Sequence, residues 1–94
     1  MDTKCVIRTE RAGVHYGSLR SRSGSELVLG SAIRIHCWDG ACSLSQLAVD
    51  GPAKPENCRF SVVVPEITLL GVIEIIPCSS KAIECIEGVK SWKV

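Results

Sequence analysis

A short stretch near the middle of the chain combines side chains that could bind an anion and stack on a planar ring. If this stretch forms an extended strand, side chains alternate between its two faces, so Arg34, His36 and Trp38 share one face. An Asp-Gly turn dipeptide follows, and Ser43 is then a candidate N-cap of a short helix. A guanidinium, an indole and a helix N-terminus in one neighbourhood indicate a site for a phosphate or a nucleotide.

Two more arginines near the start of the chain could reach the same anion. Arg8 lies in the first predicted strand and Arg11 in the turn after it, and a guanidinium can bind phosphate through two parallel hydrogen bonds. Trp38, beside the turn, offers a ring on which a purine could stack. Phe60 is a further aromatic candidate for stacking, although its ring could instead pack in the hydrophobic core.

Motifs of enzymes and of metal sites are missing from the sequence. It contains no Walker-type phosphate loop, no dinucleotide-binding glycine motif, no zinc-protease His-Glu-x-x-His and no Gly-x-Ser-x-Gly nucleophile turn. Six cysteines and two histidines are present, but no Cys-x-x-Cys occurs and the spacings do not match a zinc ribbon or finger. We therefore expect no catalytic activity, no metal and no cofactor.

Length and composition predict one small domain, 1–94, with a thin core. The chain has 94 residues, of which 46% are hydrophobic but only 4% aromatic, so aliphatic side chains must build most of the core. A core of this kind gains stability from self-association. We therefore expect a homodimer or a higher homo-oligomer.

The charge distribution favours a small anionic ligand over a long nucleic acid. Eleven basic and 10 acidic side chains give a formal net charge of +1, which is too small for bulk electrostatic binding to a polymer. Five of the six arginines nevertheless fall within the first 34 residues. The N-terminal part of the chain could thus present a local cationic surface on a nearly neutral protein.

Cysteine usage and hydropathy indicate a cytosolic chain. Six cysteines in a short secreted protein would suggest a disulfide framework, but the N-terminus lacks the apolar run and cleavage site of a secretory signal. No apolar stretch is long enough to span a membrane. We therefore expect a cytoplasmic protein with reduced, mostly buried thiols and no membrane partner.

Periodicity and turn residues predict an α+β fold, a small antiparallel β-sheet domain with two short helices. The loop at 51–57 is rich in proline and glycine, Pro65 separates two strands, and residues 89–94 form a last strand or a tail. The predicted elements are strands at 4–9, 14–22, 26–29, 32–38, 59–64 and 69–76, and helices at 43–49 and 80–87.

Several sequence runs together resemble a known family. They are V-I-R-T-x-x-A-G-V-x-x-G, A-x-R-I-x-x-W, W-D-G-A-C-S-L-S-Q-L-A-V-D-G, K-P-E-N-C-R-F-S-V and V-I-E-I-I-P-C, and they cover nearly the whole chain. The pattern resembles that of a family of small phage and prophage proteins that includes the first Thoeris anti-defence proteins.

The resemblance implies a molecular sponge. Members of that family bind and sequester the cyclic ADP-ribose isomers made by bacterial TIR-domain enzymes, without cleaving them, in the cytoplasm of the infected cell. Some members also bind cyclic oligonucleotides of the CBASS defence at a separate site, and the sites lie at subunit interfaces of a homo-oligomer. By this resemblance Arg8 or Arg11 together with Arg34 would hold phosphate, and Phe60 or Trp38 would stack the base.

Two other functions remain open at this point. A phage regulator could bind nucleic acid or a host protein through an arginine-rich hairpin, in which Arg20 and Arg22 share a strand face. These two arginines could equally be solvated charges paired with Glu10 or Glu26. The third possibility is a purely structural oligomer with no ligand.

Overall fold

The computed structural model describes residues 3–11, 13–37, 43–52 and 58–89, and it confirms the predicted α+β class. The side chains of His36 and Cys37 lie outside this description, as do Trp38, most of the predicted loop at 51–57 and most of the tail at 89–94. The elements are β1 Thr3–Thr9, β2 Val14–Ser23, β3 Glu26–Cys37, α1 Leu44–Asp50, β4 Arg59–Phe60, β5 Val64–Leu69, β6 Val72–Pro77 and α2 Ser80–Glu87.

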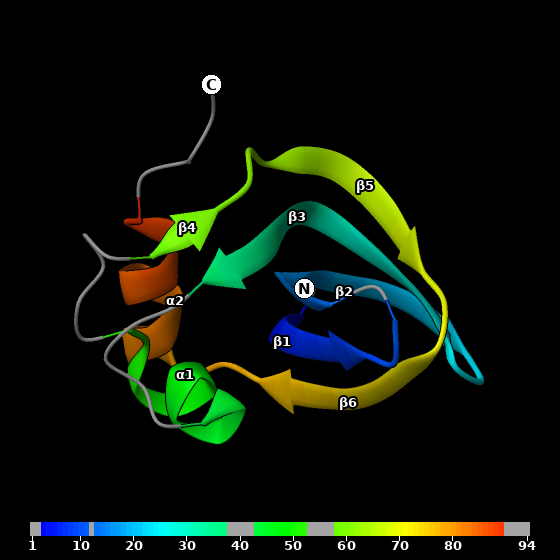
Figure 1. Cartoon of the computed structure of the whole chain (residues 1–94), viewed down its shortest axis with the longest axis horizontal. Coiled ribbons are helices and arrows are strands. Elements are labelled where there is room, and N and C mark those ends of the chain that lie inside the picture. The colour runs from blue at the N-terminus through cyan, green and yellow to red at the C-terminus, as the bar shows by residue number, and fades with distance from the viewer. Residues whose placement is uncertain (1–2, 12, 38–42, 53–57, 90–94) are drawn as a thin grey trace.

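The strands form one six-stranded sheet in the order β4-β3-β2-β1-β6, with β5 also paired to β3. Every neighbouring pair is antiparallel. β2 runs along one edge of β3, while β5 and β4 share the other edge one after the other. The sheet is curved: β5 arches over β3, and the connection from β5 leads across to β6 at the opposite side of the sheet (Figure 1).

β3 is one continuous strand where the sequence predicted two. Between the pairs Ser18↔Gly30 and Tyr16↔Ile33 the register advances by one more residue on β3 than on β2, which is a β-bulge. Ser31 accommodates it with a φ of 47°, in the left-handed region. The prediction of a break at this point was therefore wrong, because a bulge bends a strand without ending it.

The predicted strands at 59–64 and 69–76 were also divided wrongly. β4 ends at Phe60, and β5 begins at Val64 and runs through Pro65. A proline is compatible with β5 because it pairs only with β3 and is an edge strand. The chain turns instead at Leu70 and Gly71, where Gly71 has a φ of 70°.

α2 has the predicted bounds, and α1 lies one residue later than predicted, because Ser43 is its N-cap. The Ser43 hydroxyl accepts a hydrogen bond from the backbone N–H of Gln46, and the Ser79 hydroxyl accepts one from that of Ala82. Gly51 ends α1 with a φ of 74° and lies so close to α2 that a Cβ there would be 2.5 Å from the Cβ of Cys85. Glycine is thus required at position 51 for two independent reasons.

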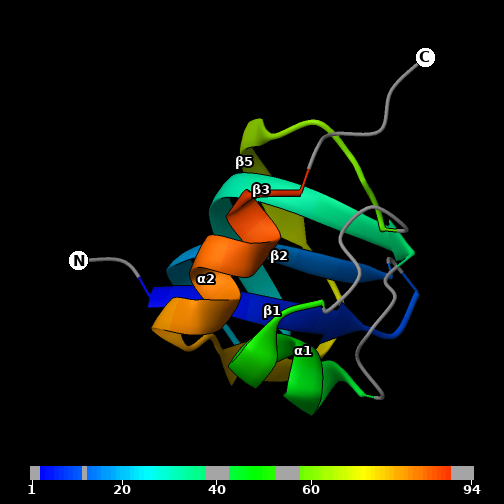
Figure 2. The same cartoon turned by 90° about the vertical axis from the view of Figure 1, so that its left-hand side faces the viewer.

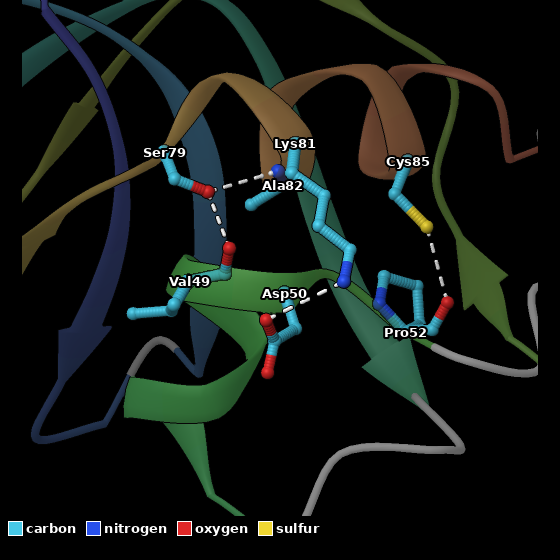
Figure 3. Close-up of polar contacts among 7 residues, drawn as sticks. All are labelled: Val49, Asp50, Pro52, Ser79, Lys81, Ala82 and Cys85. Carbon is cyan, nitrogen blue, oxygen red and sulfur yellow. Dashed lines mark hydrogen bonds and ion pairs between the residues drawn. The ribbon is translucent and has the colours of Figure 1, made fainter.

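Polar contacts join the two helices at their ends (Figure 3). The Ser79 hydroxyl donates to the carbonyl oxygen of Val49, and the Cys85 thiol donates to the carbonyl oxygen of Pro52 over 3.1 Å. Lys81 Nζ lies 3.6 Å from a carboxylate oxygen of Asp50 on the exposed side. The end of α1 and the first two turns of α2 are thus fixed relative to each other.

The sheet packs a different hydrophobic core on each face. α1 and α2 lie together against the face that carries the helix-side core (Figure 2). Alternation along β1 separates the faces, because Val6 belongs to the helix-side core while Cys5 and Ile7 belong to the inner core. The buried residues of the helix-side core are Val6, Tyr16, Ile33, Ile35, Leu47, Ala48, Cys58, Phe60, Ala82 and Ile86. Those of the inner core are Cys5, Ile7, Leu27, Leu29, Ala32 and Leu69.

Cysteines in the described part of the chain lie in or near the two cores. Cys5 and Cys58 are buried, and Cys78 and Cys85 are partly buried. Burial raises the pKa of the Cys5 thiol, and burial together with the nearby Cys5 raises that of Cys78 to about 11. Both groups therefore stay protonated at neutral pH. Neither helix in the described part of the chain has the length and apolar composition of a membrane span.

Candidate functional site

A pocket lies between β5 and the turn that joins β1 to β2, and we call it the arginine pocket. Its volume is about 450 Å³. Two guanidinium groups and one carboxylate lie among mainly apolar and backbone surfaces around it. The lining residues are Glu10, Arg11, Arg34, Ile67, Thr68, Leu69, Leu70 and Gly71.

Two turns that meet at the rim place part of the pocket lining. Thr9 shapes the turn between β1 and β2, because its backbone N–H and its hydroxyl both donate to the carbonyl oxygen of Gly13. The next backbone N–H, that of Glu10, donates over 2.9 Å to the carbonyl oxygen of Gly71 in the turn between β5 and β6. Arg11 therefore lies on a turn that is hydrogen-bonded to the opposite wall of the pocket.

Arg34 is fixed at both its backbone and its side chain. Its N–H donates to the hydroxyl of Ser61 over 2.8 Å, and its carbonyl oxygen accepts from the N–H of Ser61 over 2.9 Å. Its side chain donates from Nε to Nε2 of His15 over 3.2 Å. The guanidinium itself stays exposed, so it is oriented before a ligand arrives.

A smaller pocket of about 200 Å³ adjoins the arginine pocket, and we call it the inner pocket. The two share Arg34 and Ile67 in their linings. His15 and Ser61, the two residues that fix Arg34, both line the inner pocket as well. Its described lining is His15, Ala32, Arg34, Ser61, Val64 and Ile67.

The β-bulge at Ser31 is the reason that Arg34 faces this site. Before the bulge, Leu27 and Leu29 point to the inner core, whereas after it Ala32 does. The even-numbered position Arg34 then lies on the face of the inner core, while Ile35 lies on the helix-side face. Arg34 and the isoleucines on either side of it therefore point to opposite faces of the sheet.

The structure brings together two of the five predicted binding residues, Arg11 and Arg34. Arg8 is exposed on β1, but it lies on the opposite side of that strand from Ile7, and it does not line either pocket that contains Arg34. Within one chain strand alternation turns Arg8 away from Arg34, so of these two predicted alternatives Arg11 is the one that lines the pocket with Arg34. Trp38 lies outside the described residues.

Phe60 does not offer a ring face to a ligand in this structure. Its side chain is 1% exposed and packs in the helix-side core. The predicted stacking role is therefore corrected to a structural one, because β4 places this ring under the helices rather than beside Arg34.

Sequence reasoning missed His15 and Ser61 as members of the site. His15 is the direct cross-strand partner of Arg34, and it is only 1% exposed. Strand periodicity pairs Arg34 with His36, two positions along the same strand, whereas the contact runs between strands. Only the pairing register of β2 with β3 could have revealed it, and the bulge alters that register.

A second polar cluster lies on the helix-side face. The Tyr16 hydroxyl donates to a carboxylate oxygen of Glu87 over 2.6 Å, and Lys4 Nζ lies 3.0 Å from the same oxygen. The hydrogen bond from Tyr16, together with Lys4, lowers the pKa of Glu87, while burial and the Glu87 carboxylate raise the pKa of Tyr16. This cluster ties the end of α2 to β1 and β2.

Within the described part of the chain, no group of three or more His, Cys, Asp or Glu side chains has the arrangement of a metal site. Fold and pocket together define a small α+β domain whose curved sheet carries a cationic, apolar-walled pocket. The chain belongs to the family described as "Domain of unknown function (DUF6948)", which it matches over residues 2–86. Neither the curated proteins nor the solved structures contain a match to the chain.

Proposed function

We propose that this chain binds a small anionic nucleotide of the cyclic ADP-ribose class in the arginine pocket and sequesters it without cleaving it. One observation supports this proposal. Arg11 and Arg34, which the sequence predicts to bind phosphate, line one pocket together with apolar side chains. A guanidinium suits phosphate oxygens because its donors form a planar fork.

The pocket has a suitable size and composition for such a ligand. Its volume of about 450 Å³ lies in the range of small-molecule sites, roughly 300 to 1,000 Å³. Ile67, Leu69 and Leu70 supply apolar surface that could contact a base or a ribose, while the arginines contact the phosphates. A ligand with a diphosphate between organic groups would use both kinds of surface.

The biological role follows from the family resemblance described above. We propose that the chain acts in the cytoplasm of an infected bacterium, where it withdraws cyclic ADP-ribose signals from a Thoeris defence. A homo-oligomeric state and a second capacity for cyclic oligonucleotides are part of the same proposal. Leu70, which is 65% exposed at the rim of the pocket, supports it, because a second copy could cover this apolar surface.

Calorimetric titration tests the proposal directly. The protein would be titrated with cyclic ADP-ribose isomers, linear ADP-ribose, a cyclic dinucleotide and a single-stranded oligonucleotide. We expect the tightest binding with a cyclic ADP-ribose isomer, and recovery of intact ligand after heat denaturation of the complex. Binding to none of the nucleotides would overturn the proposal, binding to the oligonucleotide alone would favour a regulator, and a cleaved product would indicate an enzyme.

Replacing Arg34 should separate binding from folding. Arg34→Ala removes the oriented guanidinium, so we expect the affinity to fall about ten- to a hundredfold, as for loss of a charged hydrogen bond worth about 1.5 to 3 kcal/mol. Arg8→Ala is the matched control, because Arg8 is an exposed arginine outside both pockets. Equal affinity losses in the two variants would contradict the assignment of the site.

A further inference from the structure

A buried histidine contacts the exposed arginine of the pocket. The side chain of His15 is 1% exposed, and its Nε2 accepts a hydrogen bond from Arg34 Nε over 3.2 Å. The two residues are direct cross-strand partners on β2 and β3. The contact is therefore built into the pairing of the sheet rather than made by two mobile surface side chains.

The direction of this hydrogen bond specifies the protonation state of the imidazole. Arginine has only donors, so Nε2 of His15 must be the unprotonated nitrogen that accepts, and the ring proton must be on Nδ1. A protonated imidazole has two donors and no acceptor, so it cannot form this bond. The contact exists only while His15 is neutral.

The same bond leaves the pocket-facing donors of Arg34 free for a ligand. A guanidinium has five N–H donors, and Nε supplies one of them. Nε is hydrogen-bonded to His15 and the backbone of Arg34 is held by Ser61, so the other four donors are those of the two terminal nitrogens. Preorganisation of this kind increases affinity because less side-chain freedom is lost on binding.

We propose that His15 is a positioning residue, whose neutral imidazole holds the Arg34 guanidinium toward the arginine pocket. This inference rests on the proposed function, because it assumes that the pocket binds a phosphate-bearing ligand. It adds to that function a buried acceptor that orients Arg34 before the ligand binds.

The surroundings of His15 make its protonation incompatible with the observed contact. The neighbour on β1 is Ile7, β5 contributes Val64 and Ile67, and Ser61 adds a hydroxyl. Among the described residues that line the two pockets, the charged ones are Arg34 itself, which makes the contact, and Glu10 and Arg11. A positive charge on His15 would lie about one hydrogen-bond length from that of Arg34, and the repulsion between them is strengthened by burial.

Binding of cyclic ADP-ribose at about pH 7.5 tests the inference. In His15→Gln the amide oxygen can accept from Arg34, so we expect an affinity close to that of the wild type. In His15→Leu no acceptor remains, and we expect the affinity to fall at least about tenfold. Thermal unfolding shows whether each variant is folded.

His15→Gln is the matched control for His15→Leu, because both variants remove the imidazole and only glutamine keeps an acceptor. Full affinity in a folded His15→Leu variant would overturn the inference. So would an equal loss of affinity in the two variants.

A measurement without ligand separates this inference from the proposed function. Long-range proton–nitrogen NMR spectra of the wild type should show the Nδ1–H tautomer of His15 at neutral pH, and the Nε2–H tautomer would overturn the inference. If the Nδ1–H tautomer is present but the wild type binds no nucleotide, the proposed function fails, and the role of His15 in ligand binding fails with it.

Discussion

The two faces of the sheet use the same strands for different purposes. On the helix-side face, large side chains such as Tyr16, Phe60 and Ile86 are fully buried under α1 and α2. On the other face, the inner core gives way at one end to the arginine pocket and the inner pocket. One face thus supplies most of the packing that holds the fold, and the other combines packing with a polar site.

This division explains why the site can contain polar groups that contribute little to the stability of the fold. The buried imidazole of His15 and the exposed guanidinium of Arg34 contribute little hydrophobic stability where they lie. The helices on the opposite face compensate for this, because each of them buries an apolar stripe against the sheet. If the division is real, substitutions on the two faces should affect different measured quantities.

The largest expected effect is on the helix-side face. Phe60→Ala removes a ring that is 1% exposed, so we expect the free energy of unfolding to fall by about 3 to 5 kcal/mol. Urea denaturation monitored by circular dichroism would measure the change. Val49→Ala is the control, because Val49 is 56% exposed on α1, and it should change stability by less than about 0.5 kcal/mol. Similar values for the two variants would contradict the assignment of Phe60 to the core.

The hydrogen bond between Tyr16 and Glu87 should affect stability but not binding. Tyr16→Phe removes a charged hydrogen bond, so we expect a loss of about 1.5 to 3 kcal/mol at neutral pH. The affinity for nucleotide should stay unchanged, because Tyr16 lies on the face opposite the arginine pocket. A large loss of affinity in a folded Tyr16→Phe variant would show that the two faces are coupled.

The same pair predicts how stability depends on acid. The hydrogen bond from Tyr16 lowers the pKa of Glu87 below its ordinary value of 4.5 in the folded state. Its contribution is therefore complete above the unfolded pKa and is lost as the pH falls through the folded pKa. Denaturation curves between about pH 6 and pH 2 should show a decline that is smaller in Tyr16→Phe than in the wild type, and parallel declines would exclude Glu87 as a source.

The smallest expected effect concerns the bulge that both faces share. Ser31 adopts a φ of 47°, which glycine tolerates and a β-branched residue does not. Ser31→Gly should therefore leave stability unchanged or raise it by up to about 1 kcal/mol, whereas Ser31→Val should lower it by about 1 to 2 kcal/mol. Thermal unfolding of both variants measures the difference, and equal melting temperatures would show that the bulge is not strained at this residue.

Local signals in the sequence were sufficient for some elements and insufficient for others. The bounds of α2 were predicted correctly because a serine cap, an apolar stripe and a terminal glycine all lie within a few residues of one another. The strands after Phe60 were divided wrongly because Pro65 is acceptable at a sheet edge, and edge position depends on the whole sheet.

The candidate site was predictable only in part for the same reason. Arg34 could be chosen from its strand pattern and Arg11 from its turn, since each judgement needs only neighbouring residues. The contact of Arg34 with His15 depends on the pairing register of the strands. The orientation of Arg8 away from the pocket depends on which face each strand presents. These are properties of the assembled sheet.

The bulge at Ser31 reverses the alternation of side chains between the two faces of β3. Upstream of it the odd-numbered side chains face the inner core, and downstream the even-numbered ones do. A deletion of one residue here would exchange the faces of everything that follows in the strand, turning Arg34 toward the helices and Ile35 toward the pocket. In members of this family, a one-residue insertion or deletion between positions 29 and 32 should therefore change ligand recognition more than most substitutions in the pocket itself.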